Sequence, residues 1–195
     1  MGRNLEVTAM TLYSLLLFAH IAGALFLFAG LAMEWVLISF LKRNPDLAPI
    51  SAWGRLFFVA PRLYGPALGV ILLSGGYLGA QMRAWEQGWI RVSFVTLFII
   101  GLIGAIFTAP RARAIRKLLA AASDSTIREL QTRLQDPVLV VSVRLRTALV
   151  FGVVLLMVSK LGLGPSLIAM ACATAFGLLI ALPAWKRAPR PQTTA

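Results

Sequence analysis

Five long runs of apolar residues constrain the fold of this 195-residue chain more than any other feature. A transmembrane helix needs about 20 mostly apolar residues to cross the hydrocarbon core of a bilayer. The runs cover residues 11–41, 64–82, 90–109, 138–161 and 166–185. Hydrophobic residues make up 59% of the chain and charged residues 13%, whereas soluble domains carry about 45–50% and about 25%. The sequence therefore predicts an all-α polytopic membrane protein, with residues 1–195 forming one bundle of five transmembrane helices.

The basic residues are distributed unevenly between the two ends of these predicted helices. Five spans place the termini on opposite sides of the membrane, and 15 of the 19 lysines and arginines then fall on one side. That side holds the first loop, a basic loop with a short helix over 110–137, and a tail over 186–195. Because cytoplasmic loops are enriched in Lys and Arg, we expect the N-terminus outside and the C-terminus in the cytoplasm. The expected location is a bacterial inner (cytoplasmic) membrane.

The segments on this basic side have two patterns of their own. Apolar residues from Trp53 to Ala60 recur at helical spacing, which fits either a short interfacial helix or an ordinary loop. Thr126 and Glu129 form a capping-box pattern, and Asp136 with the following proline ends the helix that it opens. Four basic residues just after the third span are candidates for contact with anionic lipids or an acidic partner. They are Arg111, Arg113, Arg116 and Lys117. Nucleic-acid recognition motifs are missing, so we expect no nucleic-acid partner.

The first span carries the only histidine of the chain on a grooved face. His20, Gly23, Leu27, Gly30 and Glu34 are separated by three or four residues, which places them along one stripe of a helix. Ionisable residues inside a membrane usually face the bundle interior and are candidates for function. The stripe is therefore the candidate site of this sequence. Lys160, near the end of the fourth span, is the other intramembrane polar candidate.

Several interpretations of His20 stay open at this level. A neutral imidazole can form a hydrogen bond with a carbonyl or hydroxyl group on a neighbouring helix. Histidine is also an axial ligand of haem b, and the flanking glycines would let a flat macrocycle approach. A proton or quinone site is a third alternative, because histidine titrates near neutral pH. A copper site with Met10 and Met82 is a fourth.

The remaining polar and small residues add two expectations. Glu34 lies close enough to the inner interface to pair with Arg55, Arg62 or Arg144. Small residues at intervals of three or four predict close helix packing, within the chain, with another copy, or in a larger membrane complex. They are Gly65, Gly69, Gly75 and Gly79 in the second span, Gly101 and Gly104 in the third, and Ala169, Ala173 and Gly177 in the fifth.

The stretch "FAHIAGALFLFAG" in the first span resembles the opening helix of a group of predicted bacterial integral membrane proteins of unknown function. The closing stretch "GLGPSLIAMACATAFGLLIALPAWKR" is similar to the last helix of the same group. That group is distantly similar to the copper-resistance D membrane proteins and to the membrane-type protoporphyrinogen oxidase. The resemblance implies a haem ligand at His20, because the haem-linked relatives use the histidine of their first helix in that role.

Taken together, the residues favour a non-enzymatic packing or accessory protein of the membrane. No catalytic residues and no metal site are predicted. The alternative is a haem b protein that uses His20, with Gly23, Leu27 and Gly30 forming the haem face, in electron transfer or porphyrin chemistry.

Overall fold

The computed structural model describes residues 2–43, 60–121 and 124–186. These residues are helical, apart from short turns, and contain no strand. The elements are α1 (Gly2–Arg43), α3 (Ala60–Gln81), η1 (Ala84–Glu86), α4 (Gly88–Ile103), η2 (Gly104–Thr108), α5 (Ala109–Ala121), α6 (Asp124–Leu134), α7 (Pro137–Ser159) and α8 (Leu163–Lys186). The predicted all-α class is confirmed. The amphipathic segment that begins at Trp53 lies, apart from Ala60, outside the described residues.

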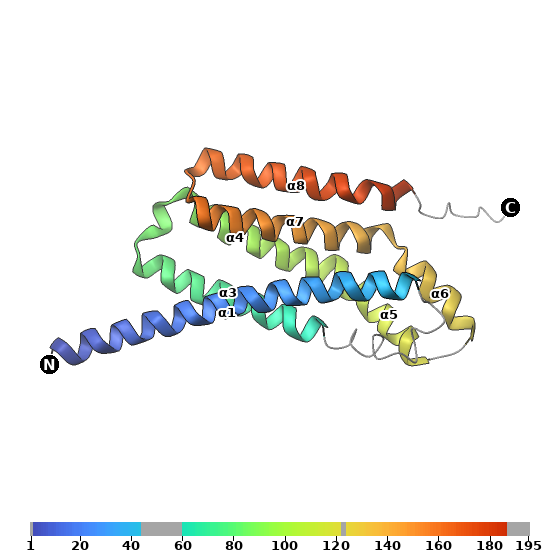
Figure 1. Cartoon of the computed structure of the whole chain (residues 1–195), viewed down its shortest axis with the longest axis horizontal. Coiled ribbons are helices and arrows are strands. Elements are labelled where there is room, and N and C mark those ends of the chain that lie inside the picture. The colour runs from blue at the N-terminus through green and yellow to red at the C-terminus, as the bar shows by residue number, and fades with distance from the viewer. Residues whose placement is uncertain (1, 44–59, 122–123, 187–195) are drawn as a thin grey trace.

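Five of the described helices are long and apolar enough to cross a membrane, which confirms the predicted number. Their candidate spans are Met10–Arg43, Leu63–Gln81, Gly88–Ala120, Glu129–Ser159 and Leu163–Leu182. The helices run side by side in alternating directions, so the N-terminus and the end of α8 lie at opposite ends of the bundle (Figure 1). The end with the N-terminus, η1 and the α7–α8 turn is called the η1 end. The opposite end, with α5 and α6, is called the α5/α6 end.

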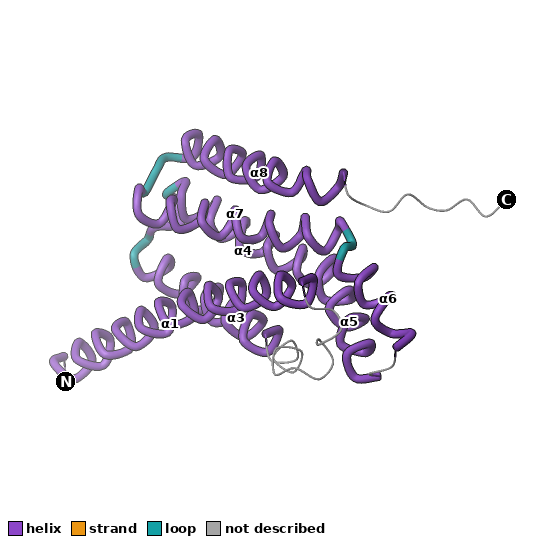
Figure 2. Tube along the Cα trace, turned by 45° about the vertical axis from the view of Figure 1, so that its right-hand side comes forward, coloured by secondary structure: helices purple, strands orange, loops and turns teal. Residues whose placement is uncertain are grey.

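Helix α7 is the centre of the bundle. It packs against α1, α4 and α8. Of the most apolar stretch in the span containing α7, 56% is buried, whereas the corresponding stretches of the other four spans are 22–33% buried. Its buried side chains Leu149, Val153 and Leu156 join the main core with residues from α1, α3, α4 and α8. Both cartoon views place α8 on the side of α7 away from α1 (Figures 1 and 2).

The basic segment over 110–137 is mostly helical. Helix α5 continues the third span beyond η2, and α6 then folds back toward α7 at the α5/α6 end (Figure 2). Helix α6 begins at Asp124, two residues before the predicted cap at Thr126. Asp136 caps α7, since its side chain accepts a hydrogen bond from the backbone N–H of Val138. Because Ile115, Leu130 and Leu134 are buried against the end of α1, the helical pair closes this end of the bundle.

The glycines predicted to pack closely fall into two groups. A Cβ atom at Gly101 would lie 2.8 Å from a Leu68 side-chain atom, and one at Gly177 would lie 3.0 Å from Ala148. These glycines therefore sit at tight contacts between helices. By contrast, a Cβ atom at Gly65 or Gly69 on α3 would meet nothing within 4 Å in the described part of the chain.

Candidate functional site

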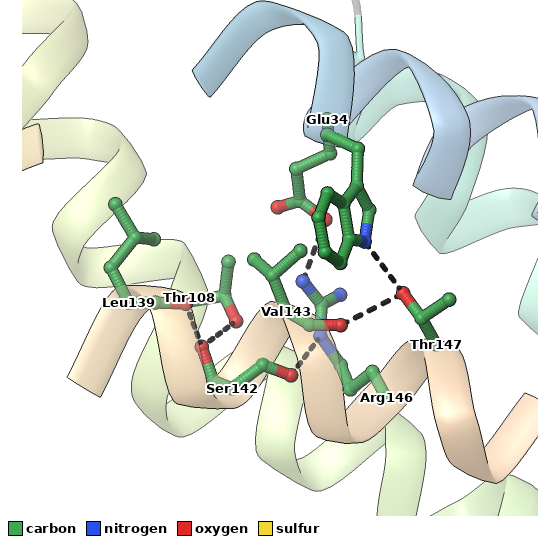
Figure 3. A network of polar contacts seen from close by, with 8 residues as sticks. Glu34, Thr108, Leu139, Ser142, Val143, Arg146 and Thr147 are labelled. Carbon is green, nitrogen blue, oxygen red and sulfur yellow. Dashed lines mark hydrogen bonds and ion pairs between the residues drawn. The ribbon is translucent and has the colours of Figure 1, made fainter. Parts of the chain in front are cut away.

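A buried ion pair connects the first and fourth spans. Arg146 of α7 donates from Nη2 to Oε2 of Glu34 on α1 over 2.7 Å (Figure 3). The Arg146 side chain is only 2% exposed and that of Glu34 is 17% exposed. At about 1.5 Å per residue, Arg146 lies roughly 14 Å along α7 from Pro137. An isolated buried charge is costly, so each of the two side chains stabilises the charge of the other.

Tyr64 of α3 packs against this ion pair from a third helix. The guanidinium carbon of Arg146 lies 4.9 Å from the centroid of the Tyr64 ring, within the range of a cation–π contact. The Tyr64 hydroxyl is buried beside the Arg146 guanidinium group, but it forms no hydrogen bond of regular geometry in the part of the chain that the structure describes. A buried hydroxyl without a partner costs free energy, so a group that accepts or donates a hydrogen bond there would be stabilised.

A chain of hydroxyl groups lies beneath the ion pair on α7. Arg146 Nε donates to the backbone oxygen of Ser142 over 3.4 Å. The Ser142 hydroxyl contacts that of Thr108 at 3.0 Å and reaches the backbone oxygen of Leu139 at 2.9 Å (Figure 3). These contacts tie α7 to η2, which is a π-helical turn at Gly104–Thr108. Such turns are rare in proteins, and those that occur often lie at functional sites.

Gly104 explains why Arg146 can reach this position. A Cβ atom at Gly104 would lie 3.3 Å from Arg146 Nη1 and 3.6 Å from a Tyr64 ring atom. A larger side chain would therefore press on both groups. The absence of a side chain at residue 104 makes room for the guanidinium group between the third and fourth spans.

A cavity of about 240 Å³ opens beside the ion pair. Its polar lining comes from Glu34, Tyr64, Thr108 and Arg146, and the rest is apolar or glycine. The other lining residues are Gly30, Gly65, Leu68, Gly101, Gly104, Ala105, Ala109 and Ala112. We call this the Glu34 pocket. An apolar cavity with a few convergent polar groups is the usual form of a small-molecule site.

His20 lies apart from this pocket, further toward the η1 end of α1. Its Nδ1 is 3.2 Å from the hydroxyl oxygen of Ser74 on α3. The Ser74 hydroxyl donates to the backbone oxygen of Val70 over 2.5 Å, so its oxygen is free to accept a hydrogen bond from Nδ1–H. This geometry corresponds to the first interpretation above, in which the imidazole binds a hydroxyl group on a neighbouring helix.

The face that carries His20 does not fit a haem. A Cβ atom at Gly75 of α3 would lie 2.9 Å from the imidazole, and one at Gly23 would lie 3.0 Å from Ile71. A Cβ atom at Gly30 would lie 3.4 Å from the Tyr64 side chain, in van der Waals contact. Helix α3 therefore fills the groove along His20, Gly23, Leu27 and Gly30, where a flat macrocycle would have to lie.

The other candidate residues lie in three different settings. The partner of Glu34 is Arg146 and not Arg144, because residues two apart on α7 point to different sides of the helix. Lys160 is exposed in the turn after α7, with left-handed backbone angles. Among the four basic candidates on α5, Arg111 is bound to Asp136 at 2.7 Å, whereas Arg113 and Lys117 are exposed. A lipid or partner contact there stays a prediction.

The sequence does not predict Tyr64 and Arg146 as site residues, although both line the Glu34 pocket. Arg146 had a signal, because it is an ionisable residue well inside the fourth span. Tyr64 had none, since tyrosine at the start of a span is typical of a membrane interface.

The fold and the site together define an integral membrane protein of five spans, with a buried Glu–Arg pair between the first and the fourth. The chain belongs to the family described as "Predicted integral membrane protein (DUF2269)", which matches residues 14–161. This segment contains Glu34, Tyr64 and Arg146. Neither a curated protein nor a solved structure matches the chain significantly.

Proposed function

We propose that this chain is a non-enzymatic accessory protein of the membrane, and that it binds a small neutral lipid-soluble molecule in the Glu34 pocket. The observation that carries the proposal is the Tyr64 hydroxyl beside the Glu34–Arg146 pair, which forms no regular hydrogen bond among the described residues and lies at the wall of an apolar cavity. The proposal includes assembly of the chain, either into a larger membrane complex as an accessory subunit or into a homo-oligomer.

The charges of the pocket select the class of ligand. Glu34 and Arg146 neutralise each other at 2.7 Å, so the pocket offers hydrogen bonds without a net charge. A charged ligand would lose its hydration in this apolar pocket and would find no net opposite charge there, so a neutral ligand is favoured. A carbonyl oxygen, by contrast, would accept a hydrogen bond from the Tyr64 hydroxyl. Gly65 lines the pocket, and a Cβ atom there would meet nothing within 4 Å among the described residues, so the backbone of α3 is open to a flat ring at this point. We therefore infer a ring compound with carbonyl groups and an apolar tail, such as a quinone.

Binding of a benzoquinone with a ten-carbon tail tests this proposal by native mass spectrometry of the purified protein. A Gly65→Leu variant should fill the pocket from its open side and remove binding. Gly69→Leu is the matched control, because Gly69 also faces open space but does not line the pocket. Tyr64→Phe should weaken binding several-fold, as expected for a lost hydrogen bond of about 1 kcal/mol. Absence of binding to the unmodified protein, or equal loss in both leucine variants, would contradict the proposal.

The orientation in the membrane is part of the proposal as well. The excess of basic residues predicts that the α5/α6 end faces the cytoplasm of a bacterial cell. A fluorescent reporter fused to the C-terminus should therefore be active, whereas an alkaline phosphatase fused there should be inactive. The reverse result would place the α5/α6 end and the Glu34 pocket nearer to the outer face.

A further inference from the structure

A second hollow surface lies on the other side of α7, away from the Glu34 pocket. Three adjoining cavities share Trp35 of α1, and the largest has a volume of about 470 Å³. The largest cavity runs over α7 between α1 and α8. It is lined by Trp35, Arg144, Thr147, Ala148, Phe151, Gly152, Leu155, Ala169, Cys172, Ala173, Phe176 and Ile180. We call this surface, together with the adjoining Lys42 and Ser39, the Trp35 groove.

The Trp35 ring is held firmly at one end of the groove. Its Nε1 donates to the Thr147 hydroxyl over 3.0 Å, and that hydroxyl donates to the backbone oxygen of Val143 over 2.9 Å. The guanidinium carbon of Arg144 lies 5.6 Å from the centroid of the Trp35 ring. Arg144 also donates to the backbone oxygen of Ile180 on α8. The groove is therefore built by contacts between α1, α7 and α8.

Among the described residues, this end of the groove carries positive charge without a compensating acid. Lys42 and Arg144 line the same cavity and are close enough for their charges to repel each other. The ion pairs among the described side chains involve Arg111, Arg133 and Arg146, but neither Lys42 nor Arg144. An anion between the two side chains would remove this repulsion.

The rest of the groove is apolar and has the length of one membrane leaflet. Phe151, Leu155 and Phe176 expose 60%, 53% and 61% of their surface. From Arg144 to Leu155, α7 rises by roughly 16 Å at about 1.5 Å per residue. Half of a hydrocarbon core of about 30 Å is about 15 Å, so the groove spans the depth of one layer of acyl chains. A basic end joined to an apolar groove of this length matches a phospholipid.

We propose that the Trp35 groove binds an anionic phospholipid, with its phosphate between Lys42 and Arg144 and an acyl chain along residues 147–155. Basic pockets between transmembrane helices at the cytoplasmic side are known sites for anionic headgroups. The site is separate from the Glu34 pocket, since the two share no lining residue, and it does not depend on the function proposed for that pocket.

Native mass spectrometry with phosphatidylglycerol or phosphatidylcholine tests the proposal. The protein should bind phosphatidylglycerol roughly 30-fold more tightly than phosphatidylcholine, as expected for two basic residues near a membrane surface. The variant Lys42→Gln/Arg144→Gln should lose this preference. Arg83→Gln/Arg91→Gln is the control, because it removes two exposed charges at the η1 end that do not line the groove, and it should keep the preference. Lys42→Gln alone, at an exposed position, should lose about half of the preference in logarithmic terms and guards against misfolding.

A further variant tests the apolar part of the groove. Cys172 is exposed and lines the cavity, so Cys172→Trp should fill it and weaken binding while the charges stay in place. Soluble glycerol phosphate should not compete with the phospholipid. Equal affinity for both lipids, equal loss in both double variants, or displacement by glycerol phosphate would overturn the proposal. Dimer formation without bound lipid would overturn it as well, and would identify a second copy of the chain as the occupant.

Discussion

Replacing Arg146 with methionine should lower the free energy of unfolding by about 3–5 kcal/mol, the cost of leaving one partner of a buried ion pair alone. Arg146 is 2% exposed and pairs with Glu34 at 2.7 Å, so the variant leaves a carboxylate in an apolar surrounding. It also removes the contact with the Tyr64 ring and the bond to the Ser142 backbone. The measurement is reversible unfolding of the purified protein in detergent, followed by circular dichroism.

A double-mutant cycle identifies the cause of this loss. In Glu34→Met/Arg146→Met both charges are gone, so the double variant should be more stable than Arg146→Met alone. The matched control is Arg133→Met, which breaks an exposed pair with Glu129 on α6 and should change stability by less than about 1 kcal/mol. If the double variant is as unstable as the single one, the unpaired carboxylate is not the reason for the loss.

The sequence predicts the helical class of this protein because the physical cause is local. Each span must present about 20 apolar residues to lipid, and that requirement is visible in any window of the chain. The stripe on α1 is predictable for the same reason, since its spacing follows from the helix repeat. Gly23, Leu27 and Gly30 are buried as this stripe requires, and the two glycines face α3.

The site could be predicted only in part, because its residues are brought together by packing. Glu34 is conspicuous as an acid inside an apolar run, but the choice between Arg144 and Arg146 depends on the rotation of α7 about its axis. Both arginines lie in the same span, and only Arg146 points toward the third span and Glu34. The π-helical turn at Gly104–Thr108 and the contact between Tyr64 and Arg146 have no local sequence signal.

The η1 end of the bundle contains a contact of the same non-local kind. The stretch "KLGLGPS" predicts a tight turn between the fourth and fifth spans, but not what packs against it. The structure places Gly88, the first residue of α4, directly on this turn. A Cβ atom at Gly88 would lie 2.3 Å from the backbone N and 2.4 Å from the Cα of Leu163. Because both atoms belong to the backbone, no side-chain rotation can relieve the overlap.

Gly88→Ala should therefore destabilise the protein by about 1–3 kcal/mol, the usual cost of overpacking, since α4 and the α7–α8 turn must move apart. Gly164→Ala is the matched control: it lies in the first turn of α8, and a Cβ atom there meets nothing within 4 Å among the described residues. Alanine is the better helix former, so this control should be neutral or more stable by at most about 1 kcal/mol. Unfolding temperatures in one detergent give the comparison. Equal temperatures for Gly88→Ala and the unmodified protein would show that α4 does not rest on this turn.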